Sequence, residues 1–227
     1  MSPALQRACT WAGPAFVAVF FGGIMCAGWL PPLSANMTAD EVARLYVEDG
    51  DRIAVGAILI GTAGMFQGIW AAVMSTQMRR IEGDRPVMTY AQLAAGGVGI
   101  LVVVLPFVFF SLAAYRPERN PEITQAFHDI GWISLVGVGW PAILQALAVG
   151  IATLSDRGTR PVFPRWFGYF NLWMAFAFVP GPLLVLFETG PFAWHGFAVF
   201  WIPAAVFGLW FGAWFVVLRR AIAEEGS

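Results

Sequence analysis

Long apolar runs, separated by short charged or proline-marked segments, dominate the hydrophobic pattern of this chain. The hydrocarbon core of a bilayer is about 30 Å thick and needs about 20 apolar residues of helix to cross it. Six runs are long enough: Trp11–Leu30, Ile53–Gln77, Met88–Tyr115, Ile130–Leu154, Trp166–Phe187 and Pro191–Leu218. The pattern predicts an all-α polytopic membrane protein with six transmembrane helices, in which residues 1–227 form a single transmembrane domain.

A short polar segment between the first two runs carries a helix pattern of its own. Thr38 and Glu41 have the spacing of a capping box, in which each side chain accepts a backbone N–H at a helix start. Val42 and Tyr46 then fall on one face, and Gly50 is typical of a helix end. We expect a short amphipathic helix on the outer surface between helices 1 and 2. It either seals the bundle or covers an entrance as a lid.

Composition agrees with a membrane location and excludes some partners. Hydrophobic residues make up 59% of the chain and charged residues 12%, whereas soluble domains carry roughly 25% charged residues. The formal net charge of −1 leaves no basic surface dense enough to hold a phosphate backbone. We therefore expect the lipid bilayer as a partner and no nucleic acid.

The distribution of arginine predicts the orientation. Of the 13 basic residues, nine lie in the N-terminal segment, the second and fourth loops and the tail, and four lie in the first and third loops. Because basic residues accumulate in cytoplasmic loops, both termini are expected to be cytoplasmic.

One spacing of polar residues occurs twice. Asp51 precedes Gln67 by 16 positions, and Asp129 precedes Gln145 by the same 16 positions. We interpret this spacing as a parallel internal repeat, as some transporters contain, with copies at residues 51–115 and 129–187. Chance matching among apolar segments is the alternative.

Three amide side chains are expected at one depth, in the cytoplasmic part of the bilayer. Sixteen residues of helix span about 24 Å, which sets Gln67 and Gln145 well below the outer Asp residues. Asn171 reaches a similar level from the inner side. An amide facing lipid tails costs several kcal/mol in unpaired groups, so these side chains should point inward. They either bond between helices or line a pocket.

Titratable side chains gather near the predicted outer ends of the helices. They are His128, Asp129, Glu188 and His195, and Asp51 can join them from the second helix. Converging carboxylate and imidazole groups transfer protons near neutral pH, which makes Asp129, His128, Glu188 and His195 the candidate catalytic residues. An ordinary wet membrane boundary is the alternative.

Motifs for cofactors are absent from the sequence. No HxxxH or HxxE spacing supports a metal site, and there is no phosphate loop, Gly-x-Ser-x-Gly elbow or haem-attachment motif. We therefore expect no metal and no cofactor.

Proline and aromatic residues indicate a cavity. The prolines that should interrupt helices three to six are Pro106, Pro141, Pro180, Pro182 and Pro203. Broken helices are tolerated in lipid where protein or a cavity satisfies the freed backbone groups. With 20 Phe and 11 Trp in the chain, aromatic faces should line such a cavity, which suits an apolar ligand.

Three stretches resemble a known family. They are Pro121-Glu122-Ile123-Thr124, Phe163-Pro164-Arg165-Trp166 leading to Asn171-Leu172-Trp173, and Thr189-Gly190-Pro191-Phe192-Ala193-Trp194. Together they resemble a family of uncharacterised bacterial six-helix integral membrane proteins, over most of the chain. The resemblance implies the bacterial inner membrane and brings no known activity, cofactor or catalytic residue.

The leading hypothesis is a protein that binds or transports a small apolar, lipid-, sterol- or terpenoid-like molecule between its helices. Gln67, Gln145 and Asn171 would be polar anchors, and Asp51, Asp129 and Glu188 an acidic outer mouth. One alternative is a membrane-embedded isomerase or cyclase acting on a lipophilic substrate, with Asp129 or Glu188 as proton donor. Another is an accessory subunit of a larger membrane complex.

Two GxxxG spacings bear on helix packing. They are Gly64/Gly68 and Gly208/Gly212, and close helix packing explains both. The same spacings are compatible with a homo-oligomer.

Overall fold

The computed structural model describes residues 2–225. All regular structure in these residues is helical, and six helical segments are long and apolar enough to cross a membrane. The first span contains α1 (Pro3–Cys9) and α2 (Ala12–Cys26). The second span is part of α3 (Ala39–Glu82), and the third is α4 (Val87–Tyr115). The fold class and the number of spans predicted from the hydrophobic pattern are confirmed.

The other three spans are each built from two or more helical pieces. The fourth contains α5 (Pro121–Trp132), the π-helical turn η1 (Ile133–Gly137) and α6 (Trp140–Ser155). The fifth contains α7 (Arg165–Ala177) and the 3₁₀ segment η2 (Gly181–Leu186). The sixth contains the π-helical turn η3 (Phe197–Trp201) and α8 (Ile202–Glu225).

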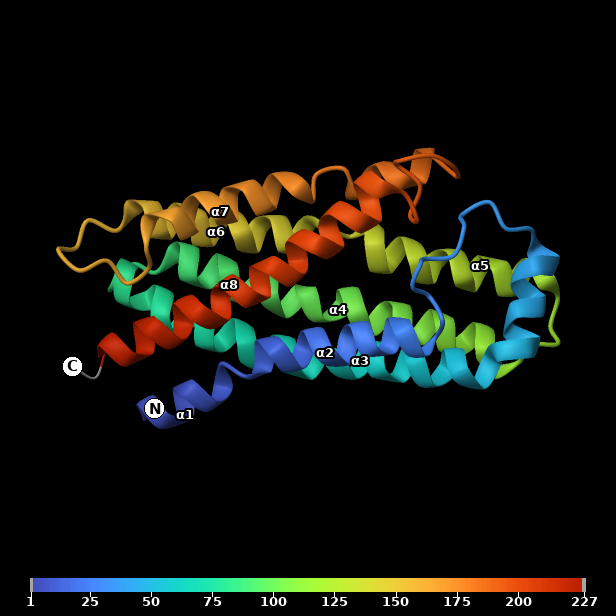
Figure 1. Ribbon diagram of the computed structural model, residues 1–227, viewed down its shortest axis with the longest axis horizontal. Coiled ribbons are helices and arrows are strands. Elements are labelled where there is room, and N and C mark those ends of the chain that lie inside the picture. The colour runs from blue at the N-terminus through green and yellow to red at the C-terminus, as the bar shows by residue number, and fades with distance from the viewer. Residues whose placement is uncertain (1, 226–227) are drawn as a thin grey trace.

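The spans run along one long axis (Figure 1). Helix α1 and the last turns of α8 lie at one end of the bundle, which we call the termini end. The α3–α4 and α6–α7 connections are at the same end. The three other connections, at residues 27–38, 116–120 and 187–196, lie at the opposite end, the far end.

The first part of α3 is the expected amphipathic helix. Its capping box is present, because the Thr38 hydroxyl accepts the Glu41 N–H and the Glu41 carboxylate accepts the Thr38 N–H at 2.8 Å. Val42 and Tyr46 are buried on its inner face. The helix does not end at Gly50 but continues to Glu82, and Figure 1 shows its first turns lying across the far end.

Backbone irregularities in the last three spans match most of the proline positions. Pro141 follows the break at Val138 and Gly139, and Pro180 and Pro182 lie at the step from α7 to η2. Pro203 stands just after η3. Pro106 is the exception, because α4 continues through it without a break. Three spans, and not four, therefore change their helical type or unwind.

The breaks in the fourth and fifth spans face each other. A Cβ atom at Gly139 would lie 3.2 Å from the carbonyl oxygen of Phe178, and one at Gly181 would lie 3.3 Å from that of Val136. Both distances are tighter than ordinary van der Waals contact. Glycine therefore lets the two unwound segments approach closely.

The two GxxxG pairs differ in their surroundings. A Cβ atom at Gly64 would lie 3.2 Å from the Val103 side chain of α4, so this pair lies against a neighbouring helix as expected. Gly208 and Gly212 have open space at their Cβ positions within the described residues. The second pair is therefore not a contact between helices of this chain, and packing inside the chain does not explain its spacing.

Candidate ligand cavity

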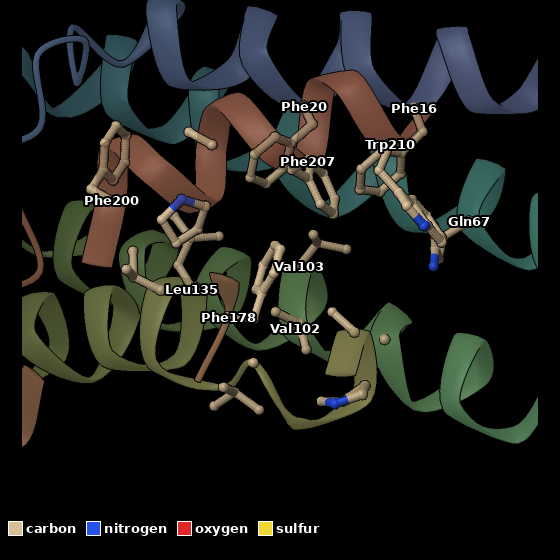
Figure 2. A pocket seen from close by; sticks show the side chains of 18 of the residues that line it. Phe16, Phe20, Gln67, Val102, Val103, Leu135, Phe178, Phe200, Phe207 and Trp210 are labelled. Atoms are coloured by element: carbon tan, nitrogen blue, oxygen red, sulfur yellow. The ribbon is translucent and has the colours of Figure 1, made fainter. Parts of the chain in front are cut away.

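A cavity of about 140 Å³, partly open to the outside of the bundle, lies between the spans beside the helix breaks. All six spans contribute to its wall, through residues that include Phe20, Gln67, Val103, Ala142, Phe178 and Phe207. Phe20 and Phe207 approach the cavity from α2 and α8, and Phe178, Val102 and Val103 approach it from the opposite side (Figure 2).

Helix irregularities and a glycine leave this space open. The wall includes Val138 and Gly139 from the break in the fourth span, and Phe178 from the end of α7. Gly99 of α4 also lines the cavity and has no side chain to fill it. The expected association of an interior cavity with interrupted helices and aromatic faces is therefore present.

Two of the three predicted amide residues line the cavity. Gln67 is 7% exposed and Gln145 is 3% exposed. Neither Oε1 of Gln67 nor Nε2 of Gln145 has a hydrogen-bond partner in the described part of the chain. A buried polar atom without a partner costs about 1–3 kcal/mol. Both amides therefore carry an unmet hydrogen-bonding capacity at the cavity wall.

The two amides converge on one stripe of α4. A Cβ atom at Gly99 would lie 3.5 Å from Nε2 of Gln67, and one at Gly96 would lie 2.9 Å from Nε2 of Gln145. Positions three residues apart on a helix are neighbours, about 5–6 Å between Cβ atoms. Gln67 from α3 and Gln145 from α6 thus reach adjacent positions on the same face of α4.

The third amide, Asn171, lies behind the cavity wall. Its Oδ1 accepts the indole N–H of Trp210 at 2.8 Å, and its Nδ2 donates to the carbonyl oxygen of Phe167 at 2.7 Å. Trp210 itself lines the cavity. Asn171 therefore positions the wall residue Trp210. It is not itself part of the wall, where the sequence predicts it as a polar anchor.

The predicted acidic mouth does not form around the cavity. Asp51 and Glu188 are exposed, Asp129 is half-buried, and none of the three lines the cavity. The charges of Asp129 and Glu188 are close enough to interact with each other. All three carboxylates therefore lie apart from the cavity wall.

The two histidines lie in separate environments at the far end of the bundle. His128 is buried, and its Nδ1 is 3.0 Å from the Tyr46 hydroxyl. His195 is half-buried in the last loop, where its Nδ1 accepts the backbone N–H of Ala35 at 3.0 Å. In residues 2–225 no group of three His, Cys, Asp or Glu side chains is arranged to hold a metal ion.

His195 makes the contact between the first and last far-end loops dependent on pH. Burial lowers its pKa below the usual value of 6.5, and protonation removes the lone pair that accepts the Ala35 N–H. The contact should be fully present above the unfolded pKa of about 6.5 and be lost as pH falls through the lower folded value. We expect hydrogen exchange at Ala35, corrected for its intrinsic pH dependence, to accelerate in acid. An equal acceleration in His195→Ala would contradict this assignment.

No family model, curated protein or solved structure matches this chain. The functional argument therefore rests on the cavity and on the side chains that form its wall.

Proposed function

We propose that this membrane protein binds a small, mainly apolar molecule in the cavity between its helices. The observation that supports the proposal is the pair of buried glutamines at the cavity wall, each with a polar atom that has no partner in the protein. Apolar side chains at these positions would avoid a cost of about 1–3 kcal/mol for each unpaired atom. A bound molecule that pairs with the amides would offset that cost.

The remaining wall favours an apolar body for the ligand. Phenylalanine, valine and proline side chains surround the two amides, and ligand pockets commonly combine such a wall with a few polar groups that fix orientation. Asp129 and Glu188, the proton donors of the enzyme alternative, lie outside this wall. Binding is therefore the function that the geometry supports best.

A glycine-to-leucine pair tests whether the cavity holds a molecule. Gly99 lines the cavity, and its Cβ position is in ordinary contact with Gln67 alone, so Gly99→Leu should place its side chain in the empty space. Gly97, two residues away on α4, has open surroundings and an exposed position. Gly97→Leu is the matched control, because both changes raise helix propensity equally.

The measurement is mass spectrometry of organic extracts from the purified full-length proteins. We expect wild type and Gly97→Leu to retain the same apolar molecule, and Gly99→Leu to lose most of it. The double variant Gln67→Leu/Gln145→Leu should also lose the molecule while remaining folded. Equal retention in Gly99→Leu and Gly97→Leu would contradict a site in this cavity.

We further propose that the protein lies in the bacterial inner membrane with both termini in the cytoplasm. The excess of arginine in the connections at the termini end supports this orientation. A C-terminal fusion to a reporter that is active in the cytoplasm alone should be active. A fusion active in the periplasm alone would reverse the orientation.

A further inference from the structure

The chemistry of the cavity wall narrows the class of ligand, provided that the proposed function holds. Within residues 2–225, the residues that line the cavity include no Arg, Asp, Glu or His. A charged ligand would therefore be buried without an opposite charge, at a cost far above that of a neutral polar group. A pure hydrocarbon would leave Oε1 of Gln67 and Nε2 of Gln145 as unpaired as they are without it. The wall thus favours a neutral ligand that carries a polar group.

The two unpaired atoms differ in kind. Oε1 of Gln67 is an acceptor and Nε2 of Gln145 is a donor. A hydroxyl group is the smallest organic group that donates one hydrogen bond and accepts others. Each amide carries both a donor and an acceptor, and neither makes a hydrogen bond within the described residues, so a hydroxyl at the cavity wall can pair with Gln67 or with Gln145.

The size of the cavity limits the body that carries the hydroxyl. Its volume is about 140 Å³, close to that of an apolar protein cavity of about 150 Å³ that binds benzene. A single ring fits such a space. The rings of Phe20, Phe178 and Phe207 border the same space and offer faces and edges to an aromatic ligand.

We infer that the cavity binds a neutral hydroxylated ring, of which a phenol is the simplest case. The hydroxyl pairs with the amide of Gln67 or of Gln145, and the aromatic wall packs against the ring. This inference rests on the proposed function and assigns the recognition of the ligand to two named side chains.

Two brominated probes of similar size test the inference. Purified full-length protein in lipid nanodiscs is titrated with 4-bromophenol and with bromobenzene, which differ by the hydroxyl group. Bromine quenches the emission of nearby tryptophan, and Trp210 lines the cavity. Quenching in Gly99→Leu gives the background from probe dissolved in lipid, and Gly97→Leu is the control for the substitution itself.

We expect wild type and Gly97→Leu to bind 4-bromophenol about tenfold more tightly than bromobenzene, because tenfold corresponds to about 1.4 kcal/mol, the net worth of a hydrogen bond. Gln67→Leu and Gln145→Leu should each lower the ratio, and the double variant Gln67→Leu/Gln145→Leu should bring it close to one while bromobenzene still binds to all three. That retained binding shows that the variants are folded.

The contrary outcomes separate the inference from the function on which it rests. Equal affinity for the two probes in wild type, with binding lost in Gly99→Leu, would overturn the hydroxyl inference and leave the binding function standing. A preference that persists in the double variant would overturn the assignment to Gln67 and Gln145. Quenching by neither probe above the Gly99→Leu background would overturn the inference and argue against the binding function.

Discussion

Gly56→Ala is expected to lower the stability of the bundle by about 1–3 kcal/mol, the usual cost of overpacking a filled core. A Cβ atom at Gly56 of α3 would lie 2.7 Å from the carbonyl oxygen of Gly23 on α2 and 2.9 Å from the amide nitrogen of Ala27. Both neighbours are backbone atoms, which cannot rotate away as a side chain can. The two helices must therefore separate along their contact to admit one methyl group.

The measurement is the midpoint of unfolding in a titration of the detergent-solubilised protein with a denaturing detergent. Gly97→Ala is the control, because it makes the same chemical change where no atom lies within 4 Å of the new Cβ. It should be neutral or stabilising by up to about 1 kcal/mol, the difference in helix propensity. A Gly56→Ala protein as stable as Gly97→Ala would show that α2 and α3 do not pack as closely as the structure has them.

Hydrophobic pattern was sufficient to predict the spans, because the length and apolar character of a helix that crosses lipid are fixed by the bilayer. It did not predict that α3 continues through Gly50. The backbone hydrogen bonds of the helix continue across that glycine, and nothing in the local sequence signals this. Nor could it distinguish Pro106, which α4 accommodates, from Pro141, which follows a break. The outcome at a proline depends on which neighbouring groups take up its lost hydrogen bond.

For the candidate site, the sequence predicts which side chains point inward but not which of them find a hydrogen-bond partner. Amide side chains avoid lipid, so the inward direction of Gln67, Gln145 and Asn171 follows from residue type alone. Whether each amide is paired depends on tertiary contacts that no spacing reveals. Asn171 meets the indole of Trp210, 39 positions away in the chain, whereas Gln67 and Gln145 each keep an unpaired atom.

Local helical spacing also could not predict the hydrogen bonds between distant residues at the far end and the termini end of the bundle. The hydroxyl of Tyr46 meets His128 across 82 positions of sequence, and no local pattern signals that pairing. At the termini end, Gln77 of α3 donates to Oε1 of Gln6 at 2.7 Å and accepts from Arg80 at 2.6 Å. No local pattern signals this network, because Gln77 stands at the end of an apolar run.

Asn171 is paired whereas Gln67 keeps an unpaired oxygen, so substitutions at these two positions should affect stability differently. Asn171→Leu leaves the indole N–H of Trp210, which is 1% exposed, without its acceptor, so we expect a loss of about 1–3 kcal/mol of unfolding free energy. Gln67→Leu removes an unpaired oxygen and should be neutral or stabilising in protein free of ligand. The same detergent titration measures both variants.

A double variant separates the hydrogen bond from general repacking around Asn171. Asn171→Leu/Trp210→Phe removes both partners, and replacing both members of a buried pair by apolar groups is often nearly neutral. The double variant should therefore recover part of the stability lost in Asn171→Leu, although Trp210→Phe also reduces the filled volume. A loss in Gln67→Leu as large as that in Asn171→Leu would mean that Gln67 has a partner within the protein, and the case for a ligand at the cavity would lose its main support.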